Sequence, residues 1–468
     1  MIKFILNNQT IETDLPKGTT VLDFVRYYKN LKGTKIGCRE GDCGACTLLV
    51  GELNKDSVKY RTQTSCLMPL ANANGKHIVT VEGINKSDGE LTKVQQAMVD
   101  ESGTQCGFCT VGFVMSLTGF CIDETPKTCQ SAISAIDGNI CRCTGYKSIE
   151  RAANALTQIL NEKNGKSSLE FAVEKGIVPG YFSKINERIQ NLKSQISGSE
   201  DQKPKTKDQR PNHFVSGGTD LYVQRPDEMV YADSENLFDN SELRFIEENG
   251  DFIEIGASAT VTDLLISPLM QNLFPNLYKH LKLVSSTPIR NMATLAGNFV
   301  NASPIGDMTA WFLALDAEIV FNDDRELLLR ELYLGYKQLA KTDDEFIKTI
   351  RFRKNFTHFN FEKVCKRTFL DIASVNTAIS LKLENNLMVG ACVSAGGVAP
   401  IPLYLRKTSE FLRGKEINEK IIFEACEVLQ SEISPISDVR GTQSYKRLLL
   451  HQLFTAHFVE LFDFQPNL

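Results

Sequence analysis

Apolar and polar residues alternate from Phe4 to Thr13 on both sides of an Asn-Asn turn, which predicts a β-hairpin at the start of the chain. After the hairpin, Thr19 or Thr20 can cap a helix whose apolar face begins at Val21. Together these patterns indicate a small domain of sheet and helix over residues 1–80.

From residue 85 to 160 the apolar residues recur at helical spacing, and we expect four helices there, the third ending before Gly138. A further helical pattern runs from Pro179 to Ile196. The apolar positions of the four helices are Leu91, Val94 and Met98, the run Val111–Ile122, the stretch Pro126–Ile136, and Ile149, Ala152, Ala153, Leu156 and Leu160.

Length and charge narrow the class of protein. With 468 residues, the chain can form three or four domains, each with its own core. Its 42% hydrophobic and 23% charged residues are those of an ordinary globular protein, and the formal net charge of −5 gives no reason to expect a nucleic acid or a membrane as partner. The N-terminus turns polar too soon for a signal peptide, so we expect a cytoplasmic protein.

Cysteine is the informative residue type. The sequence has 13 cysteines, and 10 of them precede residue 144. Disulfides are rare in a reducing cytoplasm, so closely spaced cysteines indicate metal ligands rather than bridges.

The first cysteine group places three ligands in one loop. Cys38, Cys43 and Cys46 have C-x4-C-x2-C spacing and Cys66 follows, which is the ligand order of plant-type ferredoxins. The loop has glycine at positions 37, 41 and 44, where a side chain would collide with a backbone wrapped closely around a cluster. Zinc sites usually pair two C-x2–4-C knuckles instead. The spacing therefore favours a [2Fe–2S] cluster over zinc.

A second cysteine group lies in the helical region. Cys106 and Cys109 form a C-x2-C pair, and Cys141 and Cys143 form a C-x-C pair. We expect both pairs at helix N-termini, where the helix dipole stabilises thiolates. One intervening residue strains a shared tetrahedral metal, so a C-x-C pair is unusual for zinc. These four residues are predicted to hold a second [2Fe–2S] cluster.

The two groups together resemble the iron–sulfur part of the molybdenum hydroxylases. The motif Gln105–Thr110, with the sequence QCGFCT, and the motif Gly138–Tyr146, with the sequence GNICRCTGY, carry this resemblance behind a ferredoxin-like domain. Xanthine dehydrogenases, aldehyde oxidases and carbon monoxide dehydrogenases belong to this family.

Two later segments suggest a cofactor with phosphate groups. The predicted strand Asn212–Val215 runs into Ser-Gly-Gly-Thr-Asp at 216–220, where main-chain N–H groups could reach a pyrophosphate, although an ordinary tight turn explains this segment equally well. The segment Ser285–Pro304 has almost no charge and many small residues, which suits a backbone lying along a cofactor. Because no two glycines are separated by one residue, the sequence lacks a Rossmann fingerprint.

Both segments resemble the flavin domain of the same family, which has the vanillyl-alcohol-oxidase type of FAD fold. Val284 stands where some relatives have phenylalanine, Ile347 where a leucine or isoleucine packs on the isoalloxazine, and Lys363 where a lysine contacts the flavin. The resemblance implies flavin contacts from Phe214, Val215, Ser216, Gly217, Gly218, Thr219, Asp220 and Leu221, from Val284, Thr294, Gly297, Asn298, Ser303, Ile305 and Asp307, and from Ile347 and Lys363.

We therefore expect a multidomain α+β protein. The expected parts are a plant-type ferredoxin-like β-grasp domain (1–82), a four-helix [2Fe–2S] domain (83–163), a linker with the first helix of the FAD domain and a mobile polar loop (164–210), an FAD-binding domain (211–355) and a C-terminal α/β flavoprotein subdomain (356–468).

The resemblance implies the small subunit of a bacterial-type xanthine dehydrogenase, active in purine catabolism. A large partner subunit would carry the molybdenum cofactor and hydroxylate xanthine or hypoxanthine, and two small and two large chains would form a heterotetramer. The sequence ends at Leu468 without a molybdenum domain, which fits this division. Electrons would pass through the helical-domain cluster, the ferredoxin-like cluster and FAD to NAD⁺, with no residue of this chain catalysing the hydroxylation.

Three alternatives remain open at this point. The chain could serve an aldehyde or N-heterocycle dehydrogenase instead. A self-sufficient NAD(P)H-dependent reductase would also combine FAD with a [2Fe–2S] cluster, but the second cluster and the missing Rossmann fingerprint disfavour it. A zinc-binding scaffold without enzymatic activity is the third alternative, and the absorption spectrum of the protein distinguishes it because zinc is colourless.

Overall fold

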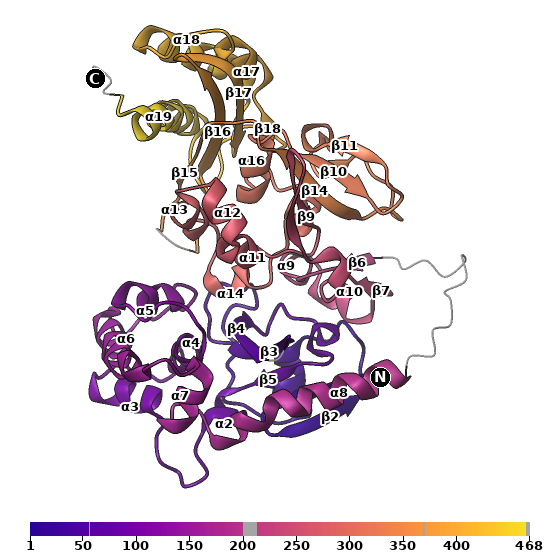
Figure 1. Ribbon diagram of the computed structural model, residues 1–468, viewed down its shortest axis with the longest axis vertical. Helices are drawn as coiled ribbons and strands as arrows, with labels where there is room; N and C mark the ends of the chain where they lie inside the picture. The colour runs from indigo at the N-terminus through magenta and orange to yellow at the C-terminus, as the bar shows by residue number, and fades with distance from the viewer. Residues whose placement is uncertain (56, 200–212, 368–369, 465–468) are drawn as a thin grey trace. The chain divides into compact units, whose positions relative to one another are not determined.

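The computed structural model describes residues 1–55, 57–199, 213–367 and 370–464 (Figure 1). Most of the polar segment 197–210, predicted to be a mobile loop, lies outside the described residues. The chain forms two compact units, the first of Met1–Asn236 with Ser286–Met292 and the second of Leu237–Ser285 with Ala293–Leu468. The short segment 286–292 thus belongs to the first unit, although the residues on both sides of it belong to the second.

The first unit opens with a mixed sheet of strand order β2-β1-β5-β3-β4. The predicted hairpin is confirmed, with Phe4 opposite Ile11, and β1 also pairs in parallel with β5. Thr20 caps the predicted helix, which continues as a π-helical segment from Phe24 to Tyr28. The elements are β1 (Ile2–Leu6), β2 (Gln9–Thr13), α1 (Val21–Asp23), β3 (Thr47–Asn54), β4 (Ser57–Thr64) and β5 (His77–Val79).

Helices follow, as the spacing predicts. The four expected helices correspond to α3, α4, α5 and α6, and α7 was not expected. Nearly every residue of α4 is buried, because the other helices and β3 surround it. The bounds are α2 (Val81–Ile84), α3 (Lys93–Asp100), α4 (Thr110–Ile122), α5 (Cys129–Ala135), α6 (Lys147–Leu160) and α7 (Ser168–Glu174).

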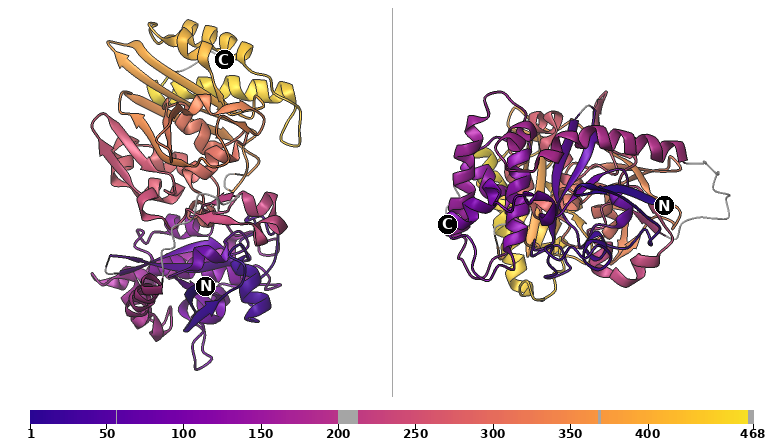
Figure 2. Two further views of the ribbon diagram at one scale, coloured as in Figure 1. Left: turned by 90° about the vertical axis from the view of Figure 1, so that its right-hand side faces the viewer. Right: turned by 90° about the horizontal axis from the view of Figure 1, so that it is seen from below.

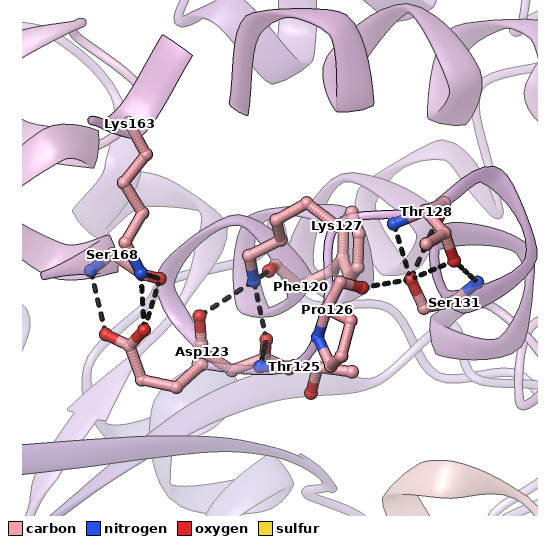
Figure 3. A network of polar contacts seen from close by, with 10 residues as sticks. Phe120, Asp123, Thr125, Pro126, Lys127, Thr128, Ser131, Lys163 and Ser168 are labelled. Carbon is pink, nitrogen blue, oxygen red and sulfur yellow. Dashed lines mark hydrogen bonds and ion pairs between the residues drawn. The ribbon is translucent and has the colours of Figure 1, made fainter. Parts of the chain in front are cut away.

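A polar network closes the C-terminal end of α4 (Figure 3). Lys127 Nζ donates to the carbonyl oxygens of Phe120 and Asp123, at 2.5 and 2.7 Å, and to the Asp123 carboxylate at 2.7 Å. A cation at this end is favourable, because the last carbonyl groups of a helix lack helical partners. Beside it, the Glu124 carboxylate accepts hydrogen bonds from Ser168 and Lys163 and so connects α4 to α7.

Helix α8 (Ile185–Ser199) lies along the sheet of the first unit (Figures 1 and 2). Its apolar face contacts Ile5 of β1 through Ile185, Ile189 and Leu192. We expected this helix to begin the flavin domain, but its apolar face packs against the ferredoxin-like sheet. Helical spacing shows which face of a helix is apolar and leaves open which surface covers it.

The remaining part of the first unit contains the first predicted phosphate loop. The strand β6 pairs in parallel with β7, and the loop after β6 leads into α9. The elements are β6 (His213–Val215), α9 (Leu221–Gln224), α10 (Pro226–Tyr231), β7 (Ser234–Asn236) and the separate turn of helix α14 (Thr287–Arg290).

The second unit contains a sheet of strand order β11-β10-β14-β9-β8, whose inner residues pack with Trp311 and Phe312 in one core. Its strands are β8 (Ile246–Asn249), β9 (Phe252–Gly256), β10 (Glu318–Phe321), β11 (Glu326–Leu328) and β14 (Ile347–Arg353), beside the pair β12 (Tyr333–Gly335) and β13 (Gln338–Leu339). Its helices are α11 (Val261–Ile266), α12 (Pro268–Leu273), α13 (Leu277–Lys282), α15 (Leu295–Asn301) and α16 (Asp307–Leu313).

The C-terminal part of the second unit is an antiparallel sheet, β15-β16-β17-β18, with helices packed along it, coloured orange and yellow in Figure 2. Its elements are β15 (His358–Val364), β16 (Val375–Glu384), β17 (Leu387–Gly396), β18 (Leu403–Tyr404), α17 (Arg406–Leu412), α18 (Glu419–Glu432) and α19 (Gln443–Phe462). The multidomain α+β architecture expected from the sequence is confirmed. Among the described residues, no helix is long and apolar enough to cross a membrane.

Two buried histidines of the second unit share one asparagine. His280 Nε2 lies 3.0 Å from Asn360 Oδ1, and Asn360 Nδ2 lies 3.0 Å from His457 Nδ1. An amide oxygen accepts and an amide nitrogen donates, so His280 carries its proton on Nε2 and His457 accepts at Nδ1. Burial lowers the pKa of His280 to about 4 and that of His457 to about 3. Both imidazoles are therefore neutral in the folded protein at neutral pH.

These pKa values predict that acid destabilises the second unit. The unfolded chain binds protons at these histidines below pH 6.5, whereas the folded chain does so only near pH 4 and pH 3. Their contribution to stability is thus complete above pH 6.5 and is lost as the pH falls below it, by up to about 2 kcal/mol per histidine on reaching about pH 5. Urea unfolding followed by circular dichroism should show this loss.

The variant His457→Asn provides the control. An asparagine oxygen can accept the Asn360 hydrogen bond without titrating in this range. We expect a smaller loss of stability between neutral and acidic pH in this variant than in the parent. Equal losses in both proteins would contradict the assignment of a neutral His457.

Candidate metal and flavin sites

The first cysteine loop folds back on its own first ligand. The backbone N–H groups of Glu40 and Cys43 donate to Cys38 Sγ at 3.3 and 3.4 Å. A Cβ on Gly37 would lie 2.5 Å from Cys43 Sγ, so only glycine fits there. The loop thus presents N–H groups to a thiolate, as an anionic cluster requires.

The four thiols of this group form two pairs. Cys46 Sγ lies 3.4 Å from Cys66 Sγ, in a buried position, and a thiol hydrogen bond joins Cys38 to Cys43. That bond, assisted by the backbone N–H groups, lowers the pKa of Cys38 to about 5. Across the described residues, no three His, Cys, Asp or Glu side chains are grouped closely enough to hold one metal ion. Paired thiols fit a cluster of two irons, in which each iron takes two cysteines.

The second group is also paired. Cys106 Sγ lies 3.6 Å from Cys143 Sγ, and a thiol hydrogen bond links Cys109 to Cys141. Cys106 and Cys143 are exposed, whereas Cys141 is buried and accepts a hydrogen bond from Thr144 Oγ1 at 3.1 Å. The eight predicted ligands therefore lie as four thiol pairs, two in each cysteine group, and each group has the four thiol donors that a [2Fe–2S] cluster takes.

Only one of the two pairs sits at a helix N-terminus. Cys109 is the N-cap residue of α4, as predicted, but Cys141 and Cys143 precede α6 by several residues. The intervening chain turns at Tyr146, which has a left-handed conformation with φ of 69° and whose hydroxyl accepts the N–H of Cys141 at 3.0 Å. The expectation of a helix dipole at the C-x-C pair was therefore wrong.

The two cysteine loops are hydrogen-bonded to each other. Ile140 N–H donates to the carbonyl oxygen of Cys43 at 3.0 Å, and Asn139 Nδ2 donates to that of Gly44 at 3.1 Å. Ser116 of α4 holds the Asn139 amide oxygen at 2.7 Å. Gly44 has φ of +67°, and a Cβ there would lie 2.2 Å from the Gly138 carbonyl oxygen. The glycine therefore permits the close approach of the two loops.

The segment 286–292 packs against both loops. A Cβ on Gly138 would lie only 2.7 Å from the Pro288 ring, and a Cβ on Gly41 would lie only 2.7 Å from the Ile289 side chain. Arg290 Nη2 lies 2.6 Å from Asp137 Oδ2, and these side chains are 2% and 1% exposed. A buried ion pair joins this segment to the residue that precedes the second cysteine loop.

The predicted flavin residues are divided between the two units. Phe214–Leu221 belong to the first unit, where Ser216 Oγ is buried without a hydrogen-bond partner among the described residues. Gly218 has φ of +81°, and a Cβ at this position would lie 2.8 Å from the Leu67 carbonyl oxygen. A buried hydroxyl without a partner and a backbone too close for a side chain are compatible with a phosphate-binding loop.

The second unit brings several other predicted flavin residues together. Lys363 Nζ, whose side chain is fully buried, donates to Asp307 Oδ2 and to the Leu283 carbonyl oxygen, both at 2.7 Å. Val284 and Ile347 are buried in the core of this unit. Thr294 caps α15 by accepting the N–H of Gly297 at 3.4 Å, Asn298 accepts hydrogen bonds from Thr309, and Ser303 accepts one from the N–H of Ile305.

Asn376 belongs to this group and was not predicted. Its Nδ2 donates to Asp307 Oδ1 at 2.7 Å and to the Ile305 carbonyl oxygen at 3.3 Å, while its Oδ1 has no partner among the described residues. The signal in the sequence is an amide side chain inside the apolar strand β16. A polar residue buried in such a strand requires a specific partner.

The paired thiols predict about four irons per chain and two distinguishable EPR signals of reduced clusters. Cys43→Ser should remove only the signal of the first cluster, and Cys106→Ser only that of the second, because each site uses its own four ligands. Loss of both signals from either single variant, or about two irons in the parent, would contradict two independent sites.

The buried ion pair predicts strong destabilisation when one partner is removed. Arg290→Met leaves the Asp137 carboxylate buried without its cation, which should cost about 3–5 kcal/mol of unfolding free energy in urea titrations. The double variant Asp137→Asn with Arg290→Met removes both charges and should recover part of that loss. A double variant no more stable than Arg290→Met would show that the charge pairing is not the cause.

Four family models match consecutive parts of the chain. A 2Fe–2S iron–sulfur cluster binding domain matches residues 4–71, and a [2Fe–2S] binding domain matches residues 80–154. The FAD binding domain in molybdopterin dehydrogenase matches residues 201–352, and the CO dehydrogenase flavoprotein C-terminal domain matches residues 361–461. The two iron–sulfur domains and the FAD-binding domain expected from the sequence are confirmed.

Individual proteins are also similar to this chain. Xanthine dehydrogenase of Emericella nidulans is 29% identical over 90% of this chain and 36% of its own length. Aldehyde oxidase 2 of Macaca fascicularis is 24% identical over 98% of this chain and 39% of its own length. A solved carbon monoxide dehydrogenase of Hydrogenophaga pseudoflava is 23% identical, covering 52% of this chain and 88% of the solved one, with a TM-score of 0.49.

The chain thus spans less than two fifths of the length of these two curated relatives. The similarity nevertheless extends over almost the whole of this chain, 90% of it for the first relative and 98% for the second. The chain thus carries two [2Fe–2S] domains and an FAD-binding domain of the molybdopterin dehydrogenase type, and it is similar to xanthine dehydrogenases over nearly its whole length.

Proposed function

We propose that this chain is the electron-transfer subunit of a cytoplasmic, xanthine dehydrogenase-like molybdenum hydroxylase. Electrons enter from a large partner subunit that carries the molybdenum cofactor and oxidises a purine such as xanthine or hypoxanthine. They pass through the helical-domain cluster and the ferredoxin-like cluster to FAD, and NAD⁺ accepts them. Two small and two large chains form the complex.

The observation that carries this proposal is the contact between the two cysteine loops. The hydrogen bond from Ile140 to Cys43 joins the residue before one predicted ligand to another predicted ligand. Electron transfer between two clusters requires that they lie close together, and the two loops share a direct hydrogen bond. Two clusters in series suit a conduit between separate redox centres, and this chain supplies their spacing and their environment.

The residues assigned to the flavin support the second half of the route. We infer that Ser216–Thr219 hold the pyrophosphate of FAD and that Asp307, Lys363 and Asn376 lie beside the flavin. When bound, FAD supplies the exchange between one-electron carriers and a two-electron acceptor. The chain's own residues bind and orient it, and we assign none of them a role in the hydroxylation.

A division of labour between subunits gives a direct test. The isolated chain should not oxidise xanthine, but it should oxidise NADH with an artificial dye, because flavin and clusters suffice for that reaction. Adding the molybdenum-containing partner should restore substrate-dependent NADH formation. Substrate oxidation by the isolated chain would overturn the proposal.

The variant Cys106→Ser separates the two activities. It should abolish substrate-dependent NADH formation and retain NADH-to-dye activity, since electrons that enter at the flavin need not cross the helical-domain cluster. Cys129→Ser, an exposed cysteine outside both ligand sets, is the matched control and should retain both activities. A screen of purines, aldehydes and N-heterocycles with the complete complex distinguishes the substrate classes.

A further inference from the structure

Arg39 has a backbone conformation that an arginine seldom adopts. It follows the first ligand, Cys38, directly and has φ of +60°. In this left-handed region the Cβ of an L-residue lies too close to the following carbonyl oxygen, so glycine is the usual occupant. The conformation persists only where surrounding contacts hold it.

Asp23 provides such a contact. Arg39 Nη2 donates to Asp23 Oδ1 at 2.6 Å and Arg39 Nη1 donates to Asp23 Oδ2 at 3.1 Å, a two-pronged ion pair. The hydrogen bond to Asp23 raises the pKa of the guanidinium. Thr20 Oγ1 also donates to Asp23 Oδ2, at 2.9 Å, and so helps to fix the carboxylate.

The carboxylate itself stands on a rigid element. Asp23 ends α1, whose other two residues, Val21 and Leu22, are completely buried in the core of the sheet domain. The cysteine loop, in contrast, is only partly buried at Cys38 and Cys43. The ion pair therefore connects an exposed part of the loop to the fixed core of the same domain.

The turn at Arg39 determines where the next N–H group points. With residue 39 in the left-handed conformation, the N–H of Glu40 donates to Cys38 Sγ at 3.3 Å. Hydrogen bonds to the sulfur atoms of a cluster stabilise its reduced, more negative form and so raise its midpoint potential. If residue 39 leaves this conformation, the N–H of Glu40 turns away from the sulfur.

We propose that Asp23 is a positioning residue for the first cluster, because it holds Arg39 in the left-handed conformation that directs the Glu40 N–H at the Cys38 sulfur. This pairing raises the midpoint potential of the first cluster and leaves the second cluster unaffected. The inference rests on the cluster assignment within the proposed function and is independent of the substrate and of the electron acceptor.

Two double variants of the full-length chain test it. One variant combines Asp23→Ala with Arg39→Ala, and the other combines Asp23→Ala with Arg39→Gly. Both variants lose one negative and one positive charge, so their net charge is that of the parent. The two variants differ only at residue 39. Alanine has a Cβ, which disfavours the left-handed conformation, whereas glycine has none. Redox titration followed by EPR gives the midpoint potentials of both clusters in each protein.

We expect the midpoint potential of the first cluster to be more negative in the alanine double variant than in the parent. At a fixed potential, the ratio of reduced to oxidised cluster should fall at least tenfold, which corresponds to about 59 mV for a one-electron couple. The glycine double variant should match the parent, and the second cluster should be unchanged in both. Loss of the first cluster from the alanine variant alone would also support the proposal, because a misdirected Cys38 binds iron poorly.

Equal potentials in the two double variants would overturn the proposal, as would loss of the first cluster from both. A parent chain without two EPR signals would instead overturn the cluster assignment, so the two failures are distinguishable. The second-cluster signal, measured in the same sample, reports whether each variant is folded.

Discussion

The hydrogen-bonded contact between the two cysteine loops is the constraint on which the first unit depends. Asn139 is buried, and both ends of its amide are hydrogen-bonded: Nδ2 donates to the Gly44 carbonyl oxygen, and Oδ1 accepts from Ser116 of α4. An amide buried in this way is costly unless both ends are paired, so the loops have few alternative arrangements. Because each loop also carries ligands, fixing the loops relative to each other fixes the two predicted clusters as well.

Segment 286–292 extends this constraint to the flavin region of the sequence. Its Arg290 is paired with Asp137 in a nearly water-free position, and Met292 is part of the core of the ferredoxin-like sheet. Breaking such a pair is costly because a buried charge remains without compensation. Residues that lie between flavin segments in the sequence therefore pack against the cysteine loops of the first unit. Along the chain, only Ala293 separates Met292 from Thr294, which caps α15 in the second unit.

The sequence predicts local features here better than contacts between distant residues. Ligand spacing identifies both groups of thiols, and helical periodicity locates α3 to α6, because both are properties of neighbouring residues. The packing of α8 on the first sheet and the pairing of Asp137 with Arg290 could not be predicted, since neither periodicity nor a motif specifies a partner more than a hundred positions away. Tyr146 explains the wrong prediction at the C-x-C pair, because a left-handed tyrosine leaves no trace in the hydrophobic pattern.

The partners of the buried Lys363 determine what this side chain can offer to a flavin. An ammonium group has three N–H donors, and Asp307 and the Leu283 carbonyl group take two of them among the described residues. The Asp307 carboxylate balances the charge of Lys363, and Asn376 holds that carboxylate from its other side. A flavin beside this group would therefore meet one directed hydrogen-bond donor rather than an uncompensated positive charge. Its potential would then depend on the geometry of that bond, which Asn376 and the Ile305–Asp307 turn control through the position of the carboxylate.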